Sequence, residues 1–166
     1  NEVDYNNYKK LKTIIPKGDY IVSIYEDKIT QKKYTVKEPK MSNISFYHYL
    51  NFDLNIEDNP CILKFQGYFI KNKKIGALFN YCSNNTLNHV IELQRNKKCT
   101  CLTDTKKLII IYGIASAMSY LHSHNILHLN LNSKFIYLDD YLHPKVSEFY
   151  DSLKIPNHIE PNSIFY

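Results

Sequence analysis

The chain has 166 residues, of which 44% are hydrophobic and 22% are charged. This length suits a single domain, and the composition is that of a globular protein, which excludes collagen-like, coiled-coil and largely disordered classes. The formal net charge is +5, but the chain holds a single arginine, Arg95. Because bidentate contacts to phosphates and bases depend mainly on arginine, we expect no nucleic acid as a partner.

The cysteines and the apolar stretches indicate the cellular compartment in which we expect the protein. The four cysteines lack the paired spacing of a zinc site, so we interpret them as free thiols; a metal site of Cys99, Cys101 and nearby histidines is the less favoured alternative. Residues 1–15 lack a secretory hydrophobic region, and the longest apolar run, residues 108–118, is shorter than the ~18 residues of a membrane span. We therefore expect a cytoplasmic protein without a membrane partner.

The first half of the chain predicts a sheet with one helix. Runs of β-branched and aromatic residues predict strands at residues 21–25, 34–37, 61–70 and 75–81. Residues 26–33 and 71–74 are polar and predict turns within the two strand pairs. Between the pairs, apolar side chains recur at helical spacing and predict a helix over residues 42–54.

The second half is predicted to be mainly helical. An amphipathic pattern predicts a helix over residues 86–95, and Thr103 or Asp104 can cap a long helix over residues 104–122. Short strands are predicted near residues 126–128, 135–138 and 145–146, whereas residues 151–166 show no periodicity. The composition changes from β-rich to α-rich at about residues 81–85, which we interpret as a hinge.

The most specific strings of the chain follow the long predicted helix. They read His128-Leu129-Asn130-Leu131-Asn132, then Phe135-Ile136-Tyr137-Leu138, then Ser147-Glu148-Phe149-Tyr150. They resemble the H-R-D-L-K-x-x-N loop, the two short strands and the D-F-G motif of eukaryotic protein kinases. Upstream, residues 34–37 resemble the V-A-I-K strand of that family, residues 59–62 its H-P-N-I turn and residues 81–87 its hinge.

Because these motifs occur in the family's order, the chain is identified as a member of the eukaryotic protein kinase superfamily. The resemblance implies a bilobal α+β fold. Residues 1–82 would form the N-lobe, with a five-stranded sheet and one helix similar to the family's αC helix. Residues 83–166 would form the first part of an α-rich C-lobe and end within the activation segment.

The same resemblance implies that the catalytic groups are degraded. The aspartate that accepts the proton of the substrate hydroxyl is replaced by Asn130, and a neutral amide cannot act as that base. Asn132 replaces the loop lysine, Phe135 replaces the asparagine that binds a second Mg²⁺, and Glu148 replaces the D-F-G aspartate. Phe135 offers no oxygen ligand, and the longer Glu148 shifts its carboxylate away from octahedral geometry, so we expect one lost and one degraded metal ligand.

The nucleotide-binding positions are altered as well. Only Gly18 remains of the three loop glycines, and Leu50 stands where the glutamate partner of Lys37 is expected. Thr35 and Tyr137 add bulk where the adenine ring would enter. We therefore assign no cofactor, except ATP and Mg²⁺ if nucleotide binding is retained. The positions implied to bind it are Gly18, Val22, Thr35, Lys37, Phe79, Tyr81, Cys82 and Tyr137.

The long helix of residues 104–122 is apolar on nearly all of its sides. A helix that is apolar all round is usually buried on all sides, so we predict an exposed apolar patch unless further chain covers the helix. The resemblance implies additional C-lobe helices beyond residue 166 that would do so. Either those helices or a protein partner is expected to cover residues 104–122.

The sequence therefore predicts a kinase-like domain without phosphotransfer, a pseudokinase that acts as a binding or scaffold module in signalling. Two alternatives stay open at this stage. The chain could be a residual ATP-binding protein kinase that uses Lys37 and Glu148, or a non-functional remnant of a kinase gene.

Overall fold

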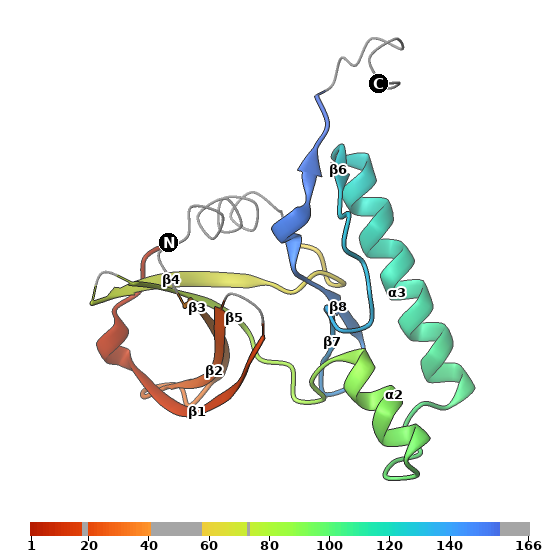
Figure 1. Cartoon of the computed structure of the whole chain (residues 1–166), viewed down its shortest axis with the longest axis horizontal. Helices are drawn as coiled ribbons and strands as arrows, with labels where there is room; N and C mark the ends of the chain where they lie inside the picture. The colour runs from red at the N-terminus through yellow and green to blue at the C-terminus, as the bar shows by residue number, and fades with distance from the viewer. Residues whose placement is uncertain (18–19, 41–57, 73, 157–166) are drawn as a thin grey trace. The chain divides into compact units, whose positions relative to one another are not determined.

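The computed structural model describes residues 1–17, 20–40, 58–72 and 74–156, which are the coloured parts of the ribbon in Figure 1. The chain divides into two compact units. Unit 1 comprises Asn1–Asp58 and Leu63–Ser83, and unit 2 comprises Asn59–Ile62 and Asn84–Tyr166. The assignment of residues 1–82 to an N-lobe and of residues 83–166 to a partial C-lobe stays a prediction.

Unit 1 is built on one antiparallel sheet, which follows the short 3-10 helix η1 (Tyr5–Asn7). The strand order is β1-β2-β3-β5-β4, and the α+β fold class with a five-stranded N-terminal sheet is confirmed. The strands are β1 (Tyr8–Lys17), β2 (Tyr20–Asp27), β3 (Lys33–Pro39), β4 (Phe65–Lys71) and β5 (Lys74–Asn80).

Strand register divides the side chains of this sheet between two faces. Val22 on β2 is paired with Lys37 on β3, and Thr35 on β3 is paired with Phe79 on β5. Directly opposed residues project to the same face, and residues two apart along a strand share a face. Val22, Thr35, Lys37 and Phe79 therefore lie on one face. The other face carries a buried cluster of Tyr25, Val36, Phe69 and Leu78.

Two strands differ from the prediction. β1 lies in a segment for which no strand was predicted, because its lysines mask the alternation of the strand. β4 begins at Phe65 and not at Cys61, so the predicted strand over residues 61–70 was wrong at its start. Cys61 and Ile62 instead belong to unit 2, where the backbone N–H of Val146 donates to the Cys61 carbonyl at 2.8 Å. The helix predicted over residues 42–54 lies outside the described residues.

In its described part, unit 2 contains two α-helices and two antiparallel pairs of short strands. Thr86 and Thr103 cap the two helices, each accepting a hydrogen bond from a backbone N–H of the first turn. β9 pairs with β6. This strand was not predicted, because a strand of two residues is too short to show periodicity in the sequence. The elements are α2 (Leu87–Arg95), α3 (Asp104–Ser123), β6 (Ile126–Leu127), β7 (Ile136–Leu138), β8 (Pro144–Val146), η2 (Phe149–Asp151) and β9 (Leu153–Lys154).

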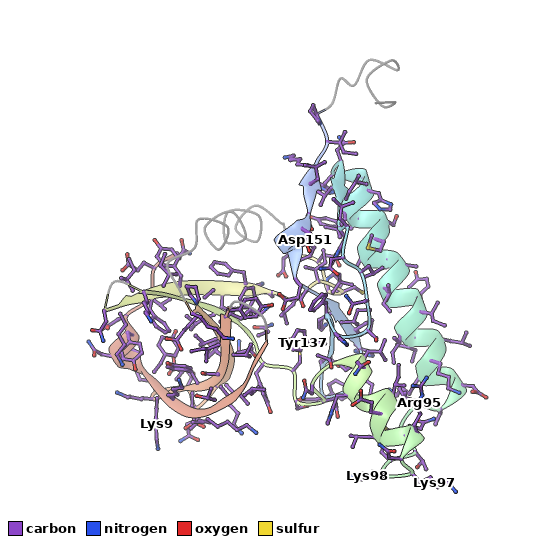
Figure 2. The ribbon with its side chains drawn as sticks, in the orientation of Figure 1. Lys9, Arg95, Lys97, Lys98, Tyr137 and Asp151 are labelled. Carbon is purple, nitrogen blue, oxygen red and sulfur yellow. The ribbon has the colours of Figure 1, made fainter. Side chains whose placement is uncertain are left out.

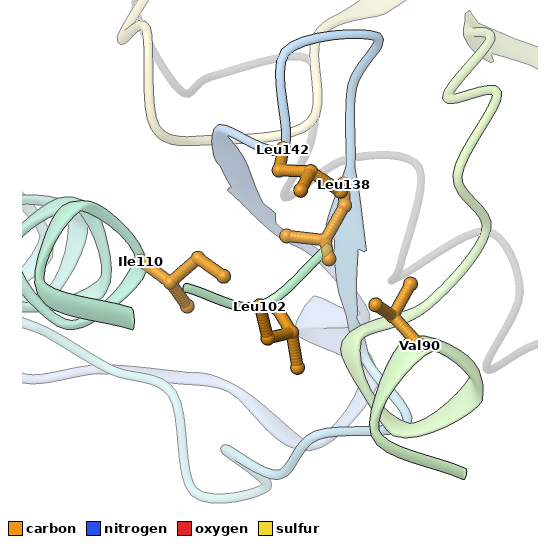
Figure 3. Close-up of a cluster of buried hydrophobic side chains, with 5 residues drawn as sticks. All are labelled: Val90, Leu102, Ile110, Leu138 and Leu142. Carbon is orange, nitrogen blue, oxygen red and sulfur yellow. The ribbon is translucent and has the colours of Figure 1, made fainter. Parts of the chain in front are cut away.

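The core of unit 2 joins both helices to the β7–β8 hairpin. Figure 3 shows its five buried side chains converging: Val90 from α2, Ile110 from α3, Leu102 from the connection between them, and Leu138 and Leu142. Burial of such side chains contributes roughly 1.5–3 kcal/mol each. This cluster fixes the hairpin that leads into the candidate site.

One face of α3 is not covered. Leu108, Ile111 and Tyr112 have exposed fractions of 67%, 63% and 78%, whereas Ile110, Gly113, Ala117 and Leu121 are buried. The apolar residues therefore include an exposed group, as the sequence predicts, and a covering partner remains a prediction. No helix within the described ranges is both long and apolar enough to cross a membrane.

Candidate functional site

The loop between β6 and β7 is anchored by His128. This side chain is 1% exposed, and its Nε2 lies 3.0 Å from the carbonyl oxygen of Ser147. Its Nδ1 accepts a hydrogen bond from the backbone N–H of Asn130 at 3.3 Å, so Nε2 is the protonated nitrogen that donates to Ser147. Burial lowers the pKa of His128, and a neutral ring fits both contacts. His128 is therefore a structural side chain that joins two loops.

Asn130 stands where the resemblance places the catalytic base. Its Nδ2 donates to the Oδ2 of Asp151 at 2.6 Å, and its Oδ1 accepts from the Nδ2 of Asn132 at 3.1 Å. Asn132 also donates to the Asn130 carbonyl at 3.1 Å, and its own Oδ1 accepts from the backbone N–H of Lys134 at 2.9 Å. Both ends of the Asn130 amide are thus used, and none of its atoms has the basicity to remove a hydroxyl proton.

Asp151 is the site residue that sequence reasoning missed. It ends η2 and is exposed, yet its carboxylate meets an amide that lies 21 residues earlier in the chain. The only signal available was its position three residues after Glu148. Figure 2 labels it in the chain that follows β8.

Glu148 occupies the position of the D-F-G aspartate. It is 4% exposed and adopts the left-handed conformation, with φ 67° and ψ 60°. Such a backbone is uncommon for a residue with a side chain and is held here by its neighbours. Ser147 donates both its N–H and its hydroxyl to the carbonyl oxygen of Phe135, at 3.0 and 2.9 Å, and Phe149 is buried against the His128 ring at 5.2 Å between centroids.

Phe135 contributes only its backbone to this arrangement, because its ring has no oxygen that could bind a cation. Of the two metal-ligand positions that the resemblance implies, only that of Glu148 therefore carries a carboxylate. Mg²⁺ takes six oxygen ligands, and the family's second metal needs a side-chain oxygen at the position of Phe135. The residues present do not fit the metal pair that the resemblance implies. Across the described ranges, no three His, Cys, Asp or Glu side chains gather closely enough to hold a metal.

The nucleotide-side residues of unit 1 lie together on one face of its sheet. Lys37 is fully buried, and its Nζ lies 4.8 Å from the centroid of the Phe79 ring and 5.7 Å from that of Tyr20. These distances are within the range of cation–π attraction. Val22 and Thr35 are buried beside them, at 5% exposure each. The sheet therefore brings together four of the eight predicted nucleotide-binding residues.

The remaining predicted positions are distributed as follows. Gly18 lies outside the described residues. Tyr81 and the buried Cys82 follow β5 in unit 1. Tyr137 lies on β7 of unit 2, where it forms an isolated bridge with Thr86 (Figure 2). The adenine site that these residues would share, and its narrowing by Thr35 and Tyr137, remain predictions.

The five-stranded sheet, the two helices and the loop from His128 to Phe149 define a kinase-like class of protein. The family model described as "Protein tyrosine and serine/threonine kinase" matches residues 23–157, which is more than half of the chain. The chain therefore belongs to the protein kinase family.

Curated relatives agree with this assignment. Interleukin-1 receptor-associated kinase 3 of Mus musculus is 30% identical over 161 residues, which are 90% of this chain and 25% of the relative. The serine/threonine-protein kinase polo of Drosophila melanogaster is 27% identical over 126 residues, 76% of this chain and 20% of the relative. Developmentally-regulated protein kinase 1 of Dictyostelium discoideum is 32% identical over 100 residues. The chain spans a quarter or less of the length of these relatives.

Proposed function

We propose that this member of the kinase family lacks phosphotransfer and acts in signalling as a pseudokinase, a binding or scaffold module. The observation that carries the proposal is the state of Asn130. A side chain at the position of the catalytic base is an amide, and it is bound at both ends, to Asp151 and to Asn132. A positioned base contributes about 10²–10⁴ in rate, and this loop provides none at that position.

The metal ligands support the same proposal. Of the two implied metal-ligand positions, only Glu148 offers a carboxylate, and Phe135 offers only its carbonyl oxygen, which accepts two hydrogen bonds from Ser147. Phosphoryl transfer depends almost entirely on positioning and on charge neutralisation by the metal ions. A chain with one acidic residue at the two implied ligand positions is poorly equipped to position the phosphates and to neutralise their charge.

The test is a phosphotransfer assay on the full chain with ATP, Mg²⁺ and a mixture of serine, threonine and tyrosine peptides. We expect no incorporation above the protein-free blank. The variant N130D/F135N/D151N restores the base and the second ligand, and it removes the carboxylate that would repel the new Asp. Recovery of activity in this variant would show that these groups were the missing ones, and activity of the unmodified chain would overturn the proposal.

Nucleotide binding is tested separately by thermal shift. A ligand that binds only the folded state stabilises it by RT ln(1 + [L]/Kd), about 2.7 kcal/mol at a hundredfold excess over Kd. We expect no rise in melting temperature with ATP and Mg²⁺. A rise that Lys37→Ala abolishes would indicate that the nucleotide site is retained.

One observation favours a second candidate function, residual protein kinase activity. The Asp151 carboxylate lies 2.6 Å from the Asn130 amide, so an acidic oxygen stands next to the position of the lost base. If Asp151 accepts the substrate proton, the unmodified chain shows slow phosphotransfer that D151N abolishes. The matched control is D140N, which removes another exposed carboxylate of unit 2.

We also propose a cytoplasmic location, which the cysteines support. All four are free, three of them partly exposed. Thiols of this kind persist in reducing compartments, which supports a cytoplasmic location. The same proposal includes a protein partner that covers the exposed face of α3, since a scaffold module needs a binding surface.

A further inference from the structure

Two cysteine thiols meet in the connection between α2 and α3. The Sγ atoms of Cys99 and Cys101 are 2.8 Å apart, and either can donate to the other. Both side chains are partly buried, and both pack against the core cluster of unit 2. Cysteines two residues apart have Cα atoms close enough for a disulfide. The two sulfurs are thus already neighbours in the reduced protein.

The backbone around this pair is held in place. The side-chain oxygen of Gln94 accepts the N–H of Leu102 at 2.9 Å, and its amide donates back to the Leu102 carbonyl at 3.4 Å. Leu102 itself is buried in the core. This reciprocal contact fixes the residue that follows Cys101, so the sulfur–sulfur contact belongs to a constrained segment and not to a free loop.

Three cations precede the pair in the sequence. Arg95, Lys97 and Lys98 are all exposed and lie at the end of α2, immediately before Cys99 (Figure 2). The backbone N–H of Lys98 donates to the Leu93 carbonyl at 2.8 Å, and Lys97 adopts the left-handed conformation with φ 55°. The turn that ends α2 therefore fixes the backbone from which the Lys97 and Lys98 side chains extend. Positive charge near a reactive site attracts anionic reactants.

We propose that Cys99 and Cys101 form a dithiol–disulfide redox site whose oxidant is a small anionic disulfide of the glutathione disulfide class. The carboxylates of such a disulfide match the cations of Arg95, Lys97 and Lys98. The site is independent of the proposed function, since it uses no residue of the kinase-like loop.

The reaction has two exchange steps. One cysteine thiolate attacks a sulfur of the oxidant, which forms a mixed disulfide and releases one glutathione thiolate. The second cysteine then loses its proton and attacks the protein sulfur of the mixed disulfide, which forms the Cys99–Cys101 bond and releases the second glutathione. Each protein sulfur is oxidised by one electron, and the oxidant is reduced to two thiols.

Burial and the neighbouring Cys99 raise the pKa of the Cys101 thiol. Cys101 therefore keeps its proton longer, which suits it to the second step and leaves the attacking role to Cys99. The ring closed by two cysteines with one residue between them is small, and strained or exposed disulfides are the more easily reduced ones. The site is thus expected to be reversible.

The test uses the full chain carrying C61S and C82S, so that only the pair remains. After incubation with glutathione disulfide, intact mass should fall by two hydrogen atoms, and an alkylating reagent should no longer add to either thiol. Adding the further change C101S should leave a stable adduct of one glutathione on Cys99. Full alkylation of both thiols after incubation would overturn the proposal, and so would a lasting glutathione adduct on the dithiol protein or a disulfide-linked dimer.

A second experiment tests the role of the three cations. K97E/K98E should slow oxidation by glutathione disulfide roughly tenfold at low salt, because electrostatic steering is lost, and should not slow oxidation by the cationic disulfide cystamine. K9E/K12E reverses two exposed lysines of β1 and is the matched control. Equal slowing by both charge reversals, or none by K97E/K98E, would overturn the role of these cations.

Discussion

At the residue scale, the contact between Asn130 and Asp151 has a direct consequence for stability. Asn130→Asp would place two carboxylates at the present distance of 2.6 Å, and like charges at that range disfavour one another. Because Asp151 is exposed, the expected cost is about 1 kcal/mol of unfolding free energy at neutral pH. Urea unfolding of N130D, D151N and N130D/D151N measures it, and the double variant should regain the loss. Equal stability of N130D and the unmodified chain at pH 7 would show that the contact is not formed in solution.

His128 makes a pH-dependent prediction at the same scale. Since burial lowers its pKa, the folded chain binds this proton less readily than the unfolded chain, whose histidine titrates near pH 6.5. The unfolding free energy should therefore fall as the pH drops from 7 toward 5, by up to about 1.4 kcal/mol per pH unit. His128→Gln should flatten this slope, whereas Ser119→Ala, which replaces an exposed and non-titrating residue of α3, should leave it unchanged. Identical slopes in the two variants would contradict the assignment.

At the element scale, the close approach of α3 to β8 depends on Gly113. A Cβ added there would lie 2.4 Å from the Cγ of Pro144. Gly113→Ala gains about 1 kcal/mol of helix propensity, but overpacking of this kind costs typically 1–3 kcal/mol, so we expect a net loss of up to about 2 kcal/mol. Thermal or urea unfolding checks it, with Ser119→Ala at an exposed position of the same helix as the control. A more stable G113A would show that Pro144 can move away.

Elements with local signals were predictable, and those decided by tertiary contacts were not. The helices carry their own caps at Thr86 and Thr103 and were predicted to within a residue at each end. The start of β4 was misplaced because the apolar run from Cys61 is buried through pairing with Val146, and not through the sheet of unit 1. The apolar run can be recognised in the local sequence, but its pairing partner, Val146, lies in a distant part of the chain.

The same distinction applies to the candidate site. Asn130, Phe135 and Glu148 were found because the order of motifs along the chain identifies their positions, and their chemistry follows from residue type alone. Asp151 was missed because its role comes from a hydrogen bond to Asn130 that spans 21 residues. Periodicity and motif spacing report neighbours along one element, whereas this contact joins two irregular segments.

At the scale of the whole molecule, the exposed apolar face of α3 should dominate the behaviour of the isolated chain. Leu108, Ile111 and Tyr112 lie within four positions on one helix and are each more than 60% exposed. Contiguous exposed apolar side chains favour association, and replacing exposed residues changes stability by about 0.5 kcal/mol at most. L108K/I111E should therefore raise the concentration at which the chain remains monomeric in sedimentation, without altering its unfolding free energy. The matched variant K106E/K107E changes charge on the same helix and leaves the apolar face intact. If it reduces association as strongly as L108K/I111E does, charge and not the apolar face controls the assembly of this chain.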